Sequence, residues 1–357
     1  MREQTLEYAV SVLKGEEVRG IYPDWYDLTG FLISHRVAGL FYVRMKGAGM
    51  RLPQKIETVL RREYETQARR TRFMRRYIRE LSSVLMKAEA EHIFLKGSVL
   101  SNAMGGEGRL SFYGAGERAS NDMDILVRPD RITAAAEVLK KLGYVQGRYE
   151  PKSGSIQPFT RAEILSRRMN RGETAPFLKL TGNAMIPYVE ADINFSLGAT
   201  PAEYTGLLSE MVSGRRKYEG KLELYSAEET AFFVQLLLHQ YKESRTLFMV
   251  NKGKDLDLYK LADIYYYWHS GLVNTEELER LLREHKAEAA AGAVLGQVGR
   301  VFRDEDMLFA AGEYGKAVPE VTDYETGKTY RWTADERKRL CRADTRYLLE
   351  EIGDDRA

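Results

Sequence analysis

Two stretches decide the fold, FLKGS at residues 94–98 and RASNDMDILV at residues 118–127. The apolar run over 92–95 ends at a lysine, a glycine and a serine, which predicts a short strand feeding a turn. The run over 123–127 predicts a second strand. A helix is then predicted over 132–142, with Asp130 able to cap its start and Gly143 to end it. Strand, turn, strand and helix in this order indicate a small sheet covered by helices.

Further strands and helices surround these elements. Residues 177–180 and 188–195 predict a hairpin whose turn is 181–183, and its second arm places Glu190, Asp192 and Asn194 on one face. The first 90 residues predict successive helices, including a long amphipathic one over 58–90. Ser226 and Glu229 have the spacing of a capping box. A helix is predicted over 255–269, and a loop over 318–332 before a charged last helix.

The fold class predicted from this order is α+β: a small mixed sheet with flanking helices, preceded and followed by helical regions. The domain boundaries that we expect are 1–84 for an N-terminal helical region, 85–200 for the sheet-containing core and 201–357 for a C-terminal helical domain. A length of 357 residues accommodates about two domains.

Composition excludes several classes of protein. The chain has 54 Lys and Arg against 52 Asp and Glu, a formal net charge of +2, with 44% hydrophobic residues. This balance is typical of a globular protein and argues against a long nucleic-acid footprint, although a small basic cleft remains compatible with it. No run of about 18 apolar residues is present, and charges occupy the first residues, so we expect a cytoplasmic protein. The single cysteine, Cys341, excludes a disulfide framework.

Asp122 and Asp124 carry the clearest chemical signal. Side chains two residues apart on a strand point to the same face, about 6.6 Å apart along it. Two carboxylates at this range repel each other unless a cation lies between them, and Mg²⁺ with substrate phosphates suits such oxygen ligands. An isolated Asp-x-Asp, however, also occurs in many surface turns, so the neighbouring turn is needed for the interpretation.

The turn at Lys96, Gly97 and Ser98 has the properties of a phosphate-binding segment. Glycine permits close approach of the backbone to a phosphate, and main-chain N–H groups with the Ser98 hydroxyl supply donors. Lys96 and Arg118 add positive charge, although either residue is equally well explained as a solvated strand-end or loop charge. Phosphoryl or nucleotidyl transfer needs positioning and charge neutralisation, which is what this combination supplies.

The combined pattern resembles the polymerase-beta-like nucleotidyltransferase superfamily: a Gly-Ser turn, an Asp-x-Asp strand and a later single Asp. More narrowly, residues 95–98, 122–127 and 142–144 are similar to a largely uncharacterised bacterial nucleotidyltransferase family. The related toxin-type nucleotidyltransferases share a Lys-Gly-Gly and an Arg-x-Ser-x-Asp-x-Asp pattern. The resemblance covers about residues 85–198, with weaker similarity at His239 and over 258–264.

This resemblance implies roles for individual residues. The implied nucleotide-binding residues are Lys96, Gly97, Ser98, Arg118 and Ser120. The implied catalytic residues and metal ligands are Asp122, Asp124 and Asp192, holding two Mg²⁺ ions, with Mn²⁺ as an alternative ion. Glu190 lies on the same strand face as Asp192 and competes with it for the third position.

Two features depart from the family pattern. Asn194 stands where the family often has His after the third acid. The insert between Ser98 and Asp122 contains five glycines, and we interpret it as a mobile lid; these are Gly105, Gly106, Gly108, Gly114 and Gly116.

The function predicted from the sequence is Mg²⁺-dependent transfer of a nucleoside monophosphate from a nucleoside triphosphate to a hydroxyl or phosphate of an acceptor. The acceptor classes left open are a small molecule, a peptide or protein hydroxyl, and an RNA end; no membrane partner is expected. Two alternatives remain. One is glycosyl transfer from a nucleotide sugar at the same Asp-x-Asp, and the other is a degenerate nucleotide-binding or partner-binding protein without turnover.

Overall fold

A computed structural model describes residues 3–18, 20, 22–102, 112–219, 222–315 and 320–352, without the side chains of 167–171. The chain divides into two compact units. Residues Thr66–Phe232 form one, here called the sheet unit, and Met1–Glu65 with Phe233–Ala357 form the other, here called the helical unit. Within the described residues no helix combines the length and the hydropathy needed to span a membrane.

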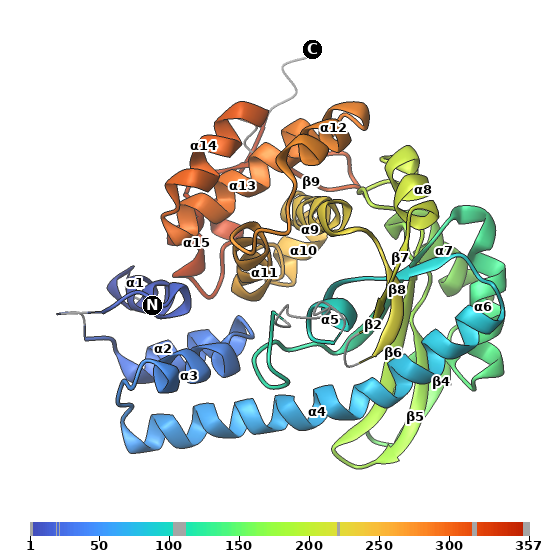
Figure 1. Ribbon diagram of the computed structural model, residues 1–357, viewed down its shortest axis with the longest axis horizontal. Coiled ribbons are helices and arrows are strands. Elements are labelled where there is room, and N and C mark those ends of the chain that lie inside the picture. The colour runs from blue at the N-terminus through green and yellow to red at the C-terminus, as the bar shows by residue number, and fades with distance from the viewer. Residues whose placement is uncertain are drawn as a thin grey trace. The chain divides into compact units, whose positions relative to one another are not determined.

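The sheet unit contains a six-stranded mixed sheet in the order β1-β2-β6-β5-β3-β4 (Figure 1). Its strands are β1 (His92–Phe94), β2 (Asp122–Val127), β3 (Val145–Glu150), β4 (Ser155–Pro158), β5 (Phe177–Asn183) and β6 (Ile186–Asn194). Strands β2 and β6 pair in parallel, whereas the other neighbouring strands of this sheet pair antiparallel. The predicted α+β fold with a small mixed sheet is therefore confirmed.

Helices and a second hairpin complete the sheet unit. They are the C-terminal part of α4 (Gln54–Lys87), α5 (Lys96–Leu100), η1 (Pro129–Arg131), α6 (Ile132–Lys141), α7 (Arg161–Arg171), α8 (Thr205–Ser213), β7 (Arg216–Glu219) and β8 (Glu223–Ser226). Strand β2 lies between β1 and β6, all its residues from Met123 to Val127 are buried, and Asp124 is the one charged residue among them. Gly143 ends α6 with a φ of +83°, as the sequence predicts.

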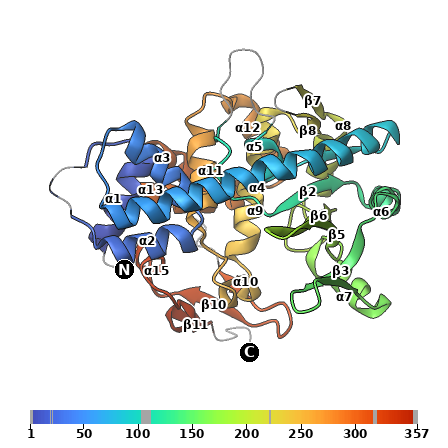
Figure 2. The same cartoon turned by 90° about the horizontal axis from the view of Figure 1, so that it is seen from below.

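The helical unit is built from α1 (Glu3–Lys14), α2 (Trp25–Ser34), α3 (Ala38–Gly47), the first turns of α4, most of α9 (Glu229–Ser244), α10 (Leu247–Asn251), α11 (Leu258–Trp268), α12 (Thr275–Glu284), α13 (Glu288–Phe302), α14 (Glu305–Tyr314) and α15 (Glu336–Leu340). Figure 2 shows α4 as one continuous helix. Helix α13 is buried on almost every side. A Cβ added at Gly299 would lie 2.8 Å from Leu308 Cγ, so glycine permits the close packing of α13 on α14.

Two local predictions of loop and turn were wrong. Residues 318–332 contain β9 (Val321–Thr322) and β10 (Thr329–Trp332) rather than only loop, and these form a three-stranded antiparallel sheet with β11 (Leu349–Glu351), after the short η2 (Arg346–Leu348). Strands this short carry too few residues to show an alternating pattern. The turn of the β5–β6 hairpin lies after Asn183 rather than over 181–183, because β5 continues through an irregular register.

The two predicted side-chain caps also differ from the structure. Ser226 ends β8 instead of capping α9, and its buried hydroxyl donates to the Phe94 carbonyl at 2.9 Å. Asp130 lies in η1 and forms ion pairs with Arg128 at 3.5 Å and Arg131 at 3.3 Å instead of capping α6. The Phe94 carbonyl in the first case, and the two arginines in the second, compete with the free N–H groups of the helix end for the side chain.

Candidate functional site

Three predicted carboxylates meet at one face of the sheet because of the parallel pairing of β2 with β6. Asp124 is the direct register partner of Asp192, and Asp122 is the partner of Glu190. Side chains of paired residues on neighbouring strands share a face, and the strands lie about 4.8 Å apart. Residues separated by about 70 positions in the sequence thus form one acidic cluster, consisting of Asp122, Asp124, Glu190 and Asp192.

The electrostatics of Asp192 show how crowded this cluster is. Burial raises the pKa of Asp192 well above its ordinary value, and the carboxylates of Glu190, Asp122, Asp124 and Glu173 raise it further. Carboxylates at this range cannot all be ionised without a compensating cation. A set of several oxygen donors of this kind fits Mg²⁺, which prefers carboxylate and phosphate oxygens.

Glu173 was missed by the sequence reasoning. It lies just before β5 and faces Asn194 through an isolated antiparallel bridge, and it contributes to the raised pKa of Asp192. Glu173 precedes the strand by several residues and belongs to no motif. Its place depends on the neighbouring backbone bond from Thr174 N–H to the Ile193 carbonyl, at 2.9 Å, which no local pattern reveals.

Asp124 is the most buried residue of the acidic cluster, with 5% of its surface exposed. The Lys96 ammonium lies 2.9 Å from Asp124 Oδ1, and the Asn194 side-chain amide donates to the same oxygen at 3.2 Å. A buried carboxylate is stable when it is paired with a charge and fully hydrogen-bonded. Lys96 therefore supplies the positive charge on this side of the cluster, and Asn194 orients the Asp124 carboxylate.

Leu95 and the first turn of α5, which contains Lys96, Gly97 and Ser98, lie directly beside Asp124. The Leu95 N–H donates to the Asp124 carbonyl at 3.0 Å, which joins the turn to the edge of β2. Lys96 adopts a φ of +48°, a conformation that costs a non-glycine residue energy and is often kept at functional positions. The Ser98 side chain is 1% exposed, and its hydroxyl has no hydrogen-bond partner in the part of the chain that the structure describes.

Gly97 is held against the segment that leads into β2. A Cβ added at Gly97 would lie 2.7 Å from Ser120 Cβ and would also overlap the Arg118 guanidinium. Ser120 donates from its hydroxyl to the Asp122 carbonyl at 3.3 Å, and Arg118 is buried. Only glycine allows this approach, so the structure places Gly97, Arg118 and Ser120 together beside the carboxylates.

The structure describes only part of the segment predicted to be a lid. Gly105, Gly106 and Gly108 lie outside the described residues, whereas Gly114 and Gly116 lie within them. A Cβ at Gly114 would come within 2.7 Å of Glu117 Oε1, so this glycine serves a tight local turn.

In the helical unit, Lys260 has a structural environment. Its ammonium pairs with the Glu243 and Asp257 carboxylates, the latter at 3.2 Å, and donates to the Lys254 carbonyl at 2.8 Å. Burial lowers the pKa of Lys260, but the charges of Glu243 and Asp257 outweigh burial and raise it overall. The buried Lys260 ammonium thus has two carboxylate partners and one carbonyl partner, and it joins α9 to α11. His239 lies 3.4 Å from Glu243 in the same network.

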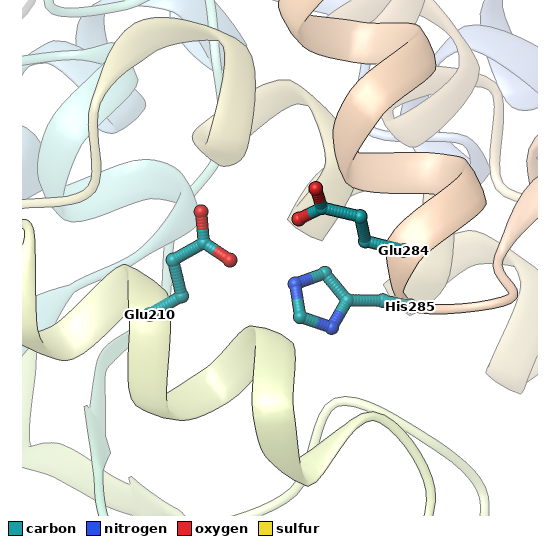
Figure 3. Close-up of side chains that lie close together, drawn as sticks. All are labelled: Glu210, Glu284 and His285. Carbon is teal, nitrogen blue, oxygen red and sulfur yellow. The ribbon is translucent and has the colours of Figure 1, made fainter.

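Figure 3 draws Glu210 of α8 with Glu284 and His285 at the end of α12. We assign no metal centre to these side chains, because Glu210 belongs to the sheet unit and the other two residues to the helical unit.

The comparison with known protein families agrees with the chemistry of the sheet unit. The family described as "uncharacterised nucleotidyltransferase" matches residues 22–303, which is most of the chain. Among curated proteins and solved structures no match is found. The chain has the acidic cluster, the glycine turn and the mixed sheet described above, and it belongs to the uncharacterised nucleotidyltransferase family, whose members are transferases of phosphorus-containing groups.

Proposed function

We propose that the protein transfers a nucleoside monophosphate from a nucleoside triphosphate to an acceptor hydroxyl, with Mg²⁺ held by the sheet unit. The observation that carries this proposal is the register of Asp124 with Asp192 across the parallel β2–β6 pair, beside the Gly97 turn. It supports a site in which metal-binding carboxylates and phosphate-binding donors lie next to each other. Membership of a nucleotidyltransferase family supports the reaction type.

The metal ligands in this proposal are Asp122, Asp124 and Asp192. Bound Mg²⁺ would supply neutralisation of phosphate charge. The donor chemistry fits two ions better than one, because the cluster includes Glu190 in addition to the three aspartates. Mn²⁺, which accepts the same oxygen ligands, is the expected substitute.

The triphosphate is assigned to the turn and its surroundings. Gly97 allows the backbone to approach a phosphate, and Lys96 and Arg118 supply charge. The Ser98 hydroxyl has no hydrogen-bond partner among the described residues and can donate to a phosphate. Ser120 supports the turn through its contact with Gly97. Because Lys96 is paired with Asp124 in this structure, its ammonium is already held at the junction between carboxylates and turn.

The acceptor hydroxyl is activated by Asp192 in this proposal. Asp192 is the direct register partner of Asp124, which supports this role, and a positioned carboxylate can accept a proton as a general base. The acceptor oxygen forms a bond to the α-phosphorus, the bond between the α-phosphorus and the bridging oxygen breaks, and pyrophosphate leaves. The proton of the acceptor passes to Asp192.

Calorimetric titration tests this proposal. ATP, GTP, CTP, UTP and UDP-glucose are titrated into the purified protein with and without Mg²⁺, and again into Asp122→Asn. We expect Mg²⁺-dependent binding of a triphosphate that the variant loses. If only UDP-glucose binds, glycosyl transfer becomes the better interpretation than nucleotidyl transfer. Binding that is unchanged in Asp122→Asn would contradict the assignment of the nucleotide site to the acidic cluster.

A further inference from the structure

The part of α4 that belongs to the sheet unit has an unusually basic sequence. Residues 69–79 contain no aspartate or glutamate and include Arg69, Arg70, Arg72, Arg75, Arg76 and Arg79. The chain as a whole nearly balances its charges, with a formal net charge of +2. This segment is therefore a local concentration of positive charge within a nearly neutral protein.

Four of these arginines form one exposed line along the helix, here called the arginine stripe. Arg69, Arg72, Arg76 and Arg79 are all exposed. Their spacings of three, four and three residues place them on a single helix face. The buried residues of the same segment, such as Met74 and Leu81, occupy the opposite face.

The arginine stripe concentrates four guanidinium groups on one face of α4. No carboxylate lies within ion-pair distance of its four guanidinium groups in the described ranges, whereas Glu80 on the same helix pairs with Lys179 at 3.2 Å. Burial lowers the pKa of the adjacent Arg75, and the charges of Arg72 and Arg79 lower it further. Like charges at this spacing destabilise a helix, so a purely solvated face gives no reason for their arrangement.

A short chain of hydrogen bonds connects this segment to the proposed nucleotide turn. The Arg75 Nε–H donates to Asn102 Oδ1 at 2.7 Å, and the Asn102 amide donates to the Ser98 carbonyl at 3.2 Å. Arg75 lies between the arginine stripe and α5. A ligand lying along the stripe would therefore run past the element that carries Ser98.

We propose that the arginine stripe binds the phosphodiester backbone of a single-stranded nucleic acid whose terminal hydroxyl is the acceptor. This inference rests on the proposed function. Guanidinium groups bind phosphates through two parallel hydrogen bonds, and the segment uses arginine without a single lysine. From Arg69 to Arg79 the helix rises about 15 Å, at about 1.5 Å per residue. That length suits contact with a few consecutive phosphates of a single strand.

The near-neutral charge of the whole chain agrees with such a short footprint. Successive arginines of the stripe are three or four residues apart, which at about 1.5 Å per residue gives an interval of about 5 Å along the helix. A regular interval of this kind favours a partner with regularly repeated negative charge over an acidic protein surface. The strand is thus held by its backbone, without selection of bases.

Binding of fluorescently labelled U15 and dT15 oligonucleotides, measured by anisotropy in EDTA without nucleotide, tests the inference. The variant is Arg72→Gln/Arg76→Gln. The matched control is Arg148→Gln/Arg161→Gln, which removes two exposed arginines of the same unit on β3 and α7. For single strands each phosphate contact contributes a slope of about −0.7 to log K against log salt, so two lost contacts weaken binding about 25-fold at about 0.1 M salt. The slope itself should fall in magnitude by about 1.4.

The outcomes separate this inference from the proposed function. Loss of binding and of salt slope in the stripe variant alone supports the inference, and the tighter of the two oligonucleotides assigns the strand to RNA or DNA. Equal losses in the stripe variant and the control, or no oligonucleotide binding at all, overturn it. Asp122→Asn should keep oligonucleotide binding, and the stripe variant should keep Mg²⁺-dependent triphosphate binding, so either proposal can fail while the other stands.

Discussion

Removing one charge from the acidic cluster should make the metal-free protein more stable while abolishing its activity. The perturbation is Asp192→Asn, which keeps the size of the side chain. Asp192 and Asp124 face each other on neighbouring strands. At a separation of about 5 Å and an effective dielectric constant of about 20, two carboxylates repel each other by about 3 kcal/mol.

The expected change in melting temperature follows from this repulsion. For domains of 150–250 residues, 1 kcal/mol corresponds to about 2–4 °C. Lys96 already neutralises part of the charge of Asp124, at 2.9 Å, so we expect the lower end of the range. Asp192→Asn should therefore raise the melting temperature in EDTA at pH 7 by roughly 6 °C. Loss of the proton acceptor should lower the rate of transfer by at least ~100-fold.

The pH dependence provides a second readout. Because the folded-state pKa of Asp192 is raised, the folded protein binds its proton more tightly than the unfolded chain. The stabilisation from this proton is complete below the unfolded pKa and is lost as the pH rises through the folded pKa. The advantage of Asp192→Asn over the unsubstituted protein should therefore be small near pH 4 and grow toward neutral pH.

Differential scanning fluorimetry between pH 4 and pH 8, in EDTA and then in Mg²⁺, measures these effects. Asp130→Asn is the matched control, because it removes an exposed carboxylate from η1 of the same unit. Mg²⁺ should stabilise the unsubstituted protein and the control more than Asp192→Asn. A melting temperature that is unchanged or lower in Asp192→Asn at every pH, with no difference in the response to Mg²⁺, would refute the crowded-carboxylate argument.

Three further substitutions test other parts of the structure. Gly97→Ala should weaken triphosphate binding at least ~10-fold in calorimetry, because the new methyl group meets Ser120; unchanged affinity would contradict the role of the turn. Ser226→Ala should lower the free energy of unfolding by about 1–3 kcal/mol in urea titration, since the buried Phe94 carbonyl loses its donor, and it should leave nucleotide affinity intact. Lys260→Met should cost about 3–5 kcal/mol by the same assay, because it removes the buried ammonium that pairs with both Glu243 and Asp257; a neutral effect would show that the network is not structural.

Local patterns were sufficient for the elements that surround the site. The apolar run that becomes β2 and the second hairpin arm with Asp192 follow from alternation and short apolar segments, because these signals act within a few residues. Residues 96–98, predicted as a turn, instead begin the short helix α5. The same signals failed at Ser226, whose hydroxyl bonds to Phe94, a residue 132 positions away. A capping serine and a serine with a distant partner have the same local sequence.

What the sequence by itself determined is the set of chemical groups: carboxylates two residues apart, a glycine-serine turn, and a later strand with acids on one face. Tertiary structure decided which of them meet. The parallel register sets Asp124 opposite Asp192, and an antiparallel bridge to Asn194 brings Glu173 near them. Lys96 and Asn194 converge on one oxygen of Asp124. Strand register depends on the packing of the whole sheet rather than on any segment of it, because a shift by one residue would turn every one of these side chains to the other face.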